Sequence, residues 1–210
     1  MNIQKLTENY INGHPSIKDN LARGLINYSK LTRMIAKETK LDARKNFDAI
    51  LIACRRYYQK IKSLKSTDEQ IIEILKRSKV EIKNKIIVAV LEKEVFVDNL
   101  LHVEKEIKKR EETFDMVEGA NSITLITSHE FIDTIKKSFK NKIIKITEHL
   151  IEITIKSPKE IETTPGTYAY LCSLFGENGI NIVETLSCWT DTIFLIKEND
   201  AGKVIGLLRF

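Results

Sequence analysis

Between residue 80 and residue 210 the chain repeats one order of sequence patterns, and this repeat limits the possible folds more than any other feature. Short runs rich in Val, Ile and Thr alternate with segments in which apolar residues recur every three or four positions. The runs are typical of strands and the segments of helices. Each copy begins with a strand and a helix, continues with two strands around a turn, and adds a second helix. The pattern therefore predicts an α+β protein.

The first copy covers residues 80–147. Strands are predicted at 85–91, 113–118, 122–127 and 142–147, and helices at 96–110 and 129–140. Gly119 lies between the second and third strands and indicates a hairpin. Residues 80–83 are predicted to add a short strand before the first.

The second copy covers residues 148–210 and stops before a fourth strand. Strands are predicted at 150–156, 180–187 and 192–196, and helices at 166–175 and from Asp200 onward. The order strand, helix, strand, strand, helix, strand is the ferredoxin-like βαββαβ arrangement. Its helices cover one face of an antiparallel sheet, so the other face needs a partner. We expect two copies in one chain, or two chains, to pack together.

Residues 1–65 have a different pattern and predict four helices. They carry nine Lys and five Arg against two Glu and three Asp, a net charge of +9, whereas the whole chain carries only +5. Such asymmetry is typical of proteins that bind nucleic acid. Short helices with this charge suggest a helix-turn-helix or winged-helix domain whose long last helix enters the major groove. The predicted DNA contacts are Arg33, Lys37, Arg44, Lys45, Asn46, Arg55 and Arg56.

A second interpretation of the basic segment is also open. It can be a helical dimerisation module whose Lys and Arg side chains are only solvated. Residues 66–79 are predicted to form a helical linker to the repeat in either case.

The most specific motif lies at residues 164–167, where Thr-Pro-Gly-Thr joins the first strand of the second copy to its helix. The sequence Glu-Asn-Gly-Ile-Asn-Ile follows at 177–182, and Leu-Ser-Cys-Trp-Thr-Asp-Thr at 186–192. Over about residues 148–210 this segment resembles the ACT domain, the amino-acid-sensing module of aspartate kinases and other regulated enzymes and repressors. The whole plan, a helical head before tandem ACT-like units, resembles a group of archaeal ACT-domain regulatory proteins.

The resemblance implies an amino-acid site between this loop and the second strand of a partner unit. Pro165 fixes the backbone at the turn, Gly166 allows close approach, and the first N–H groups of the helix can hold a carboxylate. The implied site residues are Thr164, Pro165, Gly166, Thr167, Asn178, Asn181 and Val183. The alternative is that these residues only make turns and that the unit only dimerises.

The first copy lacks this motif. Its equivalent turn is Glu92-Lys93-Glu94, and two carboxylates there would repel the carboxylate of a ligand. We therefore expect the first copy to be a pairing scaffold without a ligand of its own.

The sequence contains no recognisable catalytic motif. It has no phosphate-binding loop, nucleophile elbow or paired metal-binding histidines, and its three cysteines are scattered. No enzyme activity, cofactor or metal is therefore predicted. No secretory signal or membrane span is evident, which favours a cytoplasmic protein without a membrane partner.

These observations predict an amino-acid-sensing regulatory protein that forms a dimer or tetramer through its ACT-like units. The first hypothesis is a DNA-binding transcription regulator that responds to a free amino acid. The alternative is a non-catalytic regulatory subunit that binds the amino acid and docks on a biosynthetic enzyme.

Overall fold

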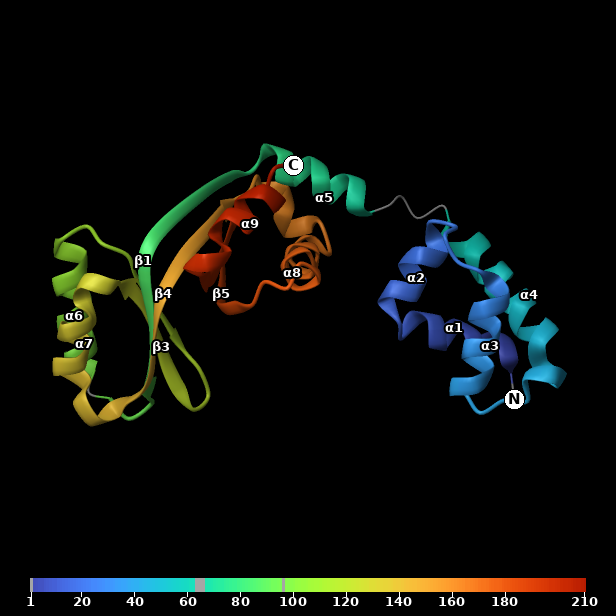
Figure 1. Cartoon of the computed structure of the whole chain (residues 1–210), viewed down its shortest axis with the longest axis horizontal. Coiled ribbons are helices and arrows are strands. Elements are labelled where there is room, and N and C mark those ends of the chain that lie inside the picture. Colours follow the sequence, from blue (N-terminus) through green and yellow to red (C-terminus); the bar gives the residue numbers. More distant parts are fainter. Residues whose placement is uncertain (1, 63–66, 96) are drawn as a thin grey trace. The chain divides into compact units, whose positions relative to one another are not determined.

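The computed structural model describes residues 2–62, 67–95 and 97–210. The chain divides into two compact units, Met1–Thr67 and Asp68–Phe210, which we call the N-terminal and C-terminal units. Figure 1 shows helices in the first and helices packed on a sheet in the second. Two predicted boundaries lie outside the described residues: Phe96 as the start of a helix, and the junction between residues 65 and 66.

The described part of the N-terminal unit is helical, as predicted. It contains α1 (Ile3–Asn12), α2 (Pro15–Ala22), α3 (Tyr28–Glu38) and α4 (Ala43–Ile61). Asn27 is the N-cap of α3, and its side chain accepts a hydrogen bond from the Lys30 N–H at 3.0 Å. Asp42 is the N-cap of α4, and its side chain accepts a hydrogen bond from the Arg44 N–H at 2.8 Å. These caps satisfy N–H groups that the first turn leaves unpaired. The helices enclose an apolar core that includes Ile11, Leu21, Leu31, Ile35, Ile50 and Cys54.

The C-terminal unit contains one six-stranded antiparallel sheet. Its strands are β1 (Lys79–Glu92), β2 (Phe114–Glu118), β3 (Ser122–Ser128), β4 (Ile143–Lys156), β5 (Ile182–Cys188) and β6 (Asp191–Lys197). Their order across the sheet is β2-β3-β1-β4-β6-β5. The two longest strands are thus central.

The two halves of β1 pair with different sets of strands, and so do the two halves of β4. Residues 86–92 of β1 pair with β3 and with the first part of β4, whereas residues 79–83 pair with residues 152–156 of β4. The register shifts where the two ladders meet, and Lys85 and His149 have left-handed backbone there, with φ of 56° and 58°. We call residues 86–147 the first lobe, and residues 68–83 with residues 150–210 the second lobe.

This sharing completes the second ferredoxin-like unit. The sequence predicts that the second copy lacks a fourth strand and that residues 80–83 belong to the first copy. In the structure residues 79–83 lie beside the second half of β4, and so supply that missing strand. The first lobe is consequently inserted into the second, between its fourth strand and its other three.

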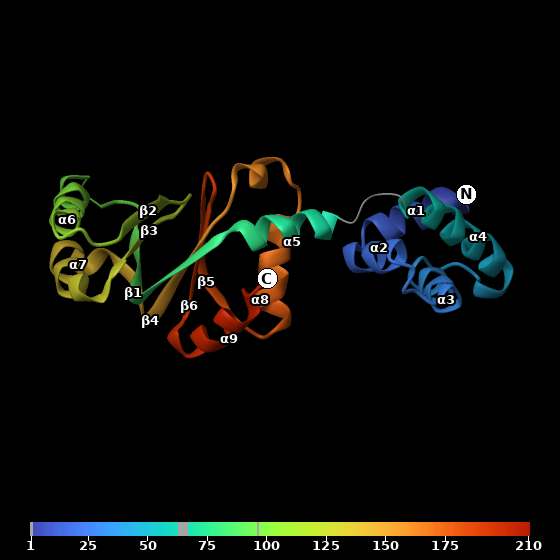
Figure 2. The ribbon, with the colours of Figure 1, turned by 90° about the horizontal axis from the view of Figure 1, so that it is seen from above.

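Helices cover one face of each lobe. Helices α6 (Val97–Lys109) and α7 (Ile132–Phe139) pack on the first lobe, and α8 (Thr167–Glu177) and α9 (Ala201–Leu207) pack on the second. Short 3-10 turns join several elements: η1 (His129–Phe131), η2 (Lys140–Lys142), η3 (Lys159–Thr163) and η4 (Glu198–Asp200). Figures 1 and 2 place the two helix pairs on opposite sides of the sheet.

The opposite faces of the two lobes meet along the central strands. Residues from both lobes form one buried apolar cluster: Ile86, Val88, Ile126, Leu150 and Leu195. The sheet faces that carry no helices therefore meet within one chain.

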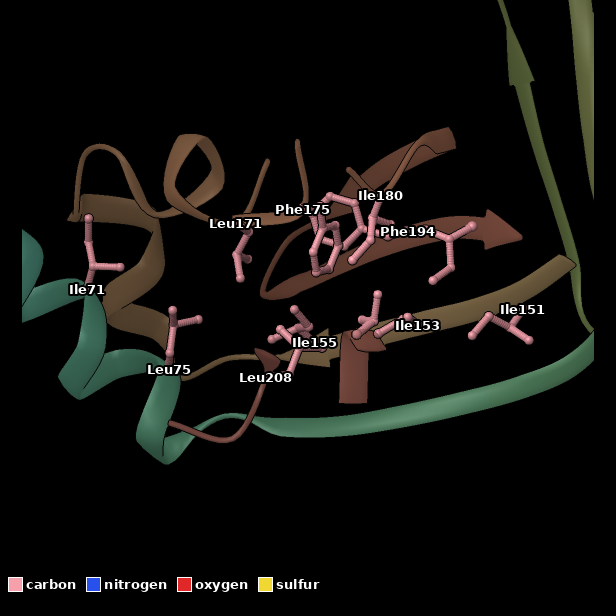
Figure 3. Packing of buried hydrophobic residues seen from close by; sticks show 12 residues of the cluster. Ile71, Leu75, Ile151, Ile153, Ile155, Leu171, Phe175, Ile180, Phe194 and Leu208 are labelled. Carbon is pink, nitrogen blue, oxygen red and sulfur yellow. The ribbon is translucent and has the colours of Figure 1, made fainter. Parts of the chain in front are cut away.

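Helix α5 (Thr67–Arg77) is part of the second lobe and more than a connection. Ile71 and Leu75 lie one turn apart on one face of the helix, and their exposed fractions are 3 % and 2 %. Figure 3 shows both side chains directed into the core formed by β4, α8 and β6. The predicted linking helix therefore contributes to the hydrophobic core.

Leu75→Ala tests this contribution. Removing a buried Leu side chain leaves a cavity, and the expected loss is about 2–5 kcal/mol in the free energy of unfolding of the C-terminal unit. Urea denaturation followed by circular dichroism and by the fluorescence of Trp189, the single tryptophan of the chain, measures it. Glu73→Ala, on the exposed face of the same helix, should change stability by less than about 0.5 kcal/mol. Equal effects of the two substitutions would contradict a core role for α5.

Candidate ligand site at the start of helix α8

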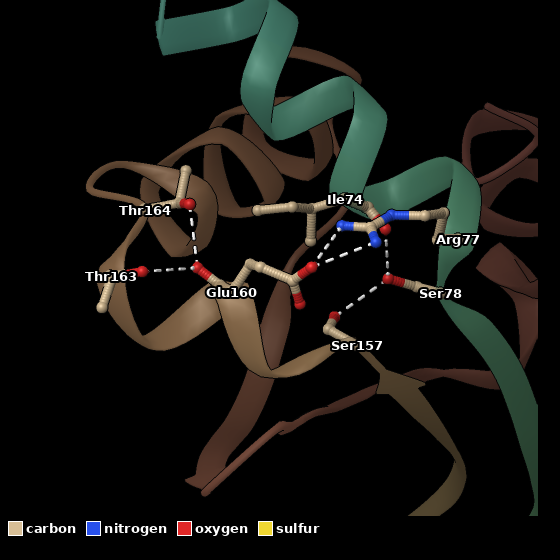
Figure 4. A network of polar contacts seen from close by, with 7 residues as sticks. All are labelled: Ile74, Arg77, Ser78, Ser157, Glu160, Thr163 and Thr164. Atoms are coloured by element: carbon tan, nitrogen blue, oxygen red, sulfur yellow. Dashed lines mark hydrogen bonds and ion pairs between the residues drawn. The ribbon is translucent and has the colours of Figure 1, made fainter.

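The loop between β4 and α8 is fixed to helix α5 by polar contacts. Both terminal nitrogens of Arg77 lie 3.1 Å from Glu160 Oε1. The Glu160 backbone N–H and this guanidinium hold the pKa of the Glu160 carboxyl below its usual value. Ser78 Oγ lies 3.0 Å from Ser157 Oγ, at the start of the same loop. Figure 4 shows these contacts joining the end of α5 to the loop.

Hydrogen bonds within the loop shape the turn into α8. Thr164 Oγ1 donates to the Glu160 carbonyl at 2.8 Å, and Thr163 Oγ1 lies 3.3 Å from the same oxygen. Thr167 is buried, and its hydroxyl donates to the Thr164 carbonyl at 3.3 Å. In these bonds the threonine hydroxyls donate to backbone carbonyls. They therefore do not cap the first N–H groups of α8.

Gly166 is the N-cap of α8 and has a φ of +92°. Residues with a Cβ rarely adopt this conformation, so the turn favours glycine. Because glycine has no side chain, no side-chain hydrogen bond caps the first N–H groups of α8. These groups are unpaired donors at the positive end of the helix dipole.

A cavity of about 210 Å³ lies at this helix start. It is lined by Ile161, Glu162, Thr164, Gly166, Thr167, Tyr168, Ser187, Trp189 and Thr192. Glu162 is the only charged side chain among the described residues that line it. The cavity therefore combines a helix N-terminus, which favours a negative group, with one carboxylate, which favours a positive group.

Aromatic side chains border the cavity. Tyr168 donates its hydroxyl to Thr185 Oγ1 at 2.9 Å, and its ring stacks against Phe194 with 6.0 Å between centres. Trp189 is 66 % exposed, and Lys159 Nζ lies 5.5 Å from the centre of its ring. Tyr168 is thus held against the sheet, whereas Trp189 is a large apolar surface at the rim.

The structure brings together only some of the predicted ligand residues. Thr164, Gly166 and Thr167 line the cavity, and Pro165 lies between the first two. Asn178 is the C-cap of α8, where its side chain donates to the Leu174 carbonyl at 2.8 Å.

The other end of α8 holds the remaining predicted residues. Eleven helical residues span about 16 Å, so Asn178 and the exposed Asn181 lie far from the cavity of the same chain. Val183 packs against the apolar cluster between the lobes. These three residues can complete the site only from a second copy of the chain, which is the arrangement the resemblance implies.

Sequence reasoning missed several residues that line the cavity: Glu162, Tyr168, Ser187, Trp189 and Thr192. Strand alternation could have identified two of them. Ser187 and Thr192 are directly paired across β5 and β6, and their side chains share the sheet face that α8 covers. The η3 turn that presents Glu162 had no sequence signal.

The predicted DNA contacts lie on the surface of α3 and α4. All except the half-buried Asn46 are exposed. Arg33 lies over the Phe47 ring at 5.6 Å, and Arg55 over the Tyr28 ring at 6.0 Å. From Arg44 to Arg56 helix α4 rises about 18 Å, so these cations extend along it and do not gather at its first turn.

Within residues 2–62, 67–95 and 97–210, no group of three His, Cys, Asp or Glu side chains is placed to hold a metal ion. Of the helices in the described residues, none has both the length and the apolar character that a membrane crossing requires.

Solved structures are similar to this chain in fold. Aspartate kinase from Clostridium acetobutylicum matches with a TM-score of 0.50 and 16 % identity, over 61 % of this chain and 33 % of that enzyme. The regulatory subunit of aspartate kinase from Thermus thermophilus matches with a TM-score of 0.48 and 12 % identity, over 61 % of this chain and 92 % of that subunit. Aspartokinase III from E. coli, solved with lysine and aspartate, matches with a TM-score of 0.46 and 12 % identity, over 61 % of this chain and 31 % of that enzyme.

The chain thus spans about a third of the length of the Clostridium enzyme. This likeness supports the ACT-like fold that the sequence resemblance implied. No protein-family model and no curated protein matches the chain.

Paired glycine substitutions test the geometry of the turn. Gly166→Ala places a Cβ on left-handed backbone and should destabilise the C-terminal unit by about 1–2 kcal/mol. Gly176 lies in the same helix, and a Cβ added there would meet no neighbouring atom, so Gly176→Ala should stabilise the unit by about 0.5–1 kcal/mol. Urea denaturation of both variants measures the difference, and effects of the same sign would contradict the assigned turn.

Proposed function

We propose that this chain is a non-catalytic regulatory protein that binds a free amino acid in the cavity at the start of α8. The observation that carries the proposal is the pairing of chemical features in that cavity. Unpaired N–H groups follow Gly166, and the Glu162 carboxylate lies in the same lining. A free amino acid carries one negative and one positive group, and so matches both.

Each part of the ligand has a counterpart in the lining. The α-carboxylate accepts hydrogen bonds from the first N–H groups of α8, and the α-ammonium lies toward Glu162. The hydroxyls of Ser187 and Thr192 offer further hydrogen bonds. Fold similarity to part of an enzyme described as allosteric, the Clostridium aspartate kinase, gives additional support to a regulatory role.

A bound ligand can act beyond the cavity through the loop that forms it. Arg77 and Ser78 tie this loop to the end of α5, and the other end of α5 is the boundary between the two units. An amino acid that binds one conformation of the loop more tightly than another increases the population of the first. The size of this shift is set by the difference between the two affinities. A second copy of the chain completes the site with Asn181 and Val183 in this proposal.

In this proposal the N-terminal unit binds the macromolecule that the protein regulates. Arg33, Lys37, Arg44, Lys45, Arg55 and Arg56 are exposed, and none of them has an ion pair within the described residues. Such cations favour duplex DNA through its phosphates. The second candidate is a protein surface that docks on a biosynthetic enzyme, which the same separate helical unit can provide.

Two substitutions of nearly equal shape test the amino-acid site. Gly166→Asp and Gly166→Asn impose similar backbone strain, but only the first adds a negative charge where the carboxylate should bind. A ligand at 100 times its Kd stabilises the protein by about 2.7 kcal/mol. In a thermal-shift screen of the twenty amino acids, we expect a response in the unsubstituted chain that persists in Gly166→Asn and disappears in Gly166→Asp. An equal response in both variants would contradict the site.

DNA binding is tested by gel retardation of random duplex DNA at increasing salt. Six or more phosphate contacts should weaken binding about 10³-fold between 50 and 200 mM salt. Arg55→Gln with Arg56→Gln should weaken it strongly. Lys5→Gln with Lys30→Gln, which removes equal charge from exposed positions on α1 and α3, should have a smaller effect. No retardation at low salt, with an enzyme co-purifying, would favour the docking candidate.

A further inference from the structure

The first lobe contains a cavity that shares no lining residue with the cavity at α8. It measures about 480 Å³ and lies between the start of α6 and the connection from α7 to β4. Val95 and Asn99 form one wall, and residues 137–142 form the other. Glu92 and Glu94 lie in the turn before α6, and on the sequence alone these carboxylates predict that the lobe has no ligand.

Positive charge dominates the lining. Lys137, Lys140 and Lys142 line the cavity, and no acidic side chain of the described residues does. Lys142 Nζ lies 2.7 Å from Glu92 Oε2, a hydrogen bond that raises the pKa of the Lys142 ammonium. This ion pair neutralises one of the two carboxylates that were expected to repel an anion.

Two ammonium groups remain without a counter-charge. Lys137 and Lys140 are exposed and have no ion pair among the described residues. Positive charges that line one concave surface raise the electrostatic potential there and attract an anion.

The backbone at Lys140 is unusual for a lysine. Helix α7 ends at Phe139, and Lys140 follows with φ of 34° and ψ of −109°. A residue with a Cβ in such a region carries a conformational cost, and such costs are common where a side chain is held for a function. This conformation turns the chain into η2 and keeps residues 140–142 along the cavity wall.

Neutral polar groups complete the lining. Asn99 Nδ2 lies 3.3 Å from the Ser138 carbonyl and so joins α6 to α7 across the cavity. Asn141 and Ser138 add an amide and a hydroxyl, which can donate hydrogen bonds to oxyanions.

We propose that the first lobe binds a small dianion, a phosphate ester or a dicarboxylate, in this cavity through Lys137 and Lys140. Two negative charges match the two unpaired ammonium groups, and charge-assisted hydrogen bonds are among the stronger ones in proteins. Among the described residues that line it, the cavity at α8 has one carboxylate and no basic side chain, so it disfavours the same ligand. The chain would therefore carry two sites of different chemistry, one in each lobe.

The test is isothermal titration of the full chain with inorganic phosphate, with succinate and with acetate, at constant ionic strength. We expect saturable binding of at least one dianion and none of acetate. Lys137→Gln with Lys140→Gln should weaken that binding at least tenfold. Lys105→Gln with Lys109→Gln removes equal charge from exposed positions of α6 outside the cavity and should leave the affinity within about twofold.

Each outcome decides a separate point. Binding of phosphate alone or of succinate alone identifies which source of dianion the cavity prefers. Equal weakening by the two double variants, binding of acetate as tight as that of the dianions, or no binding of either dianion would overturn the proposal. The amino-acid response should persist in Lys137→Gln/Lys140→Gln and the dianion response in Gly166→Asp. Failure of one site therefore remains distinguishable from failure of the other.

Discussion

The pairing of residues 79–83 with residues 152–156 is the contact on which the C-terminal unit depends. These segments are about 70 residues apart in the chain, and the whole first lobe lies between them. Their ladder supplies the fourth strand of the second lobe and places α5 against its core. Lys83 adds a charged contact, with its Nζ 2.9 Å from Oε1 of the buried Glu152. Without this pairing, β4 would be the edge strand of the second lobe.

The same pairing positions the candidate ligand site. Because β1 begins directly after α5, the strand brings Arg77 and Ser78 to the loop that follows β4. The ion pair between Arg77 and Glu160 is exposed, and such pairs contribute little to stability. Its importance here is geometric, because it joins the loop that forms the cavity to the helix at the boundary between the units.

Local sequence signals predicted most elements of the fold. Runs rich in Val, Ile and Thr predicted the strands, and Pro165 with Gly166 predicted the turn into α8. The role of residues 79–83 was not predictable, because register between distant strands depends on tertiary packing and not on local propensity. Residues 66–79 were predicted only as a linking helix, because an apolar helix face such as that of Ile71 and Leu75 does not say which core it covers.

In the candidate sites too, some residues were predictable from local sequence and others are brought together only by the fold. Thr164, Gly166 and Thr167 are neighbours in sequence, and their grouping at the α8 cavity followed from the motif. Glu162, Ser187 and Thr192 reach that cavity only through the fold. In the first lobe Glu92 suggested repulsion of anions, whereas the fold pairs this carboxylate with Lys142. Charges that are distant in sequence neutralise each other in ways that a local reading does not include.

The central claim is that an amino acid binds at the start of α8. Amide NMR spectra of the full chain, recorded during titration with the amino acid of largest thermal shift, test it most directly. We expect saturable shifts centred on residues 164–168 and 187–192, which include most of the residues that line the cavity. Shifts centred on residues 137–142, or in the N-terminal unit with none at Thr167 and Tyr168, would contradict it.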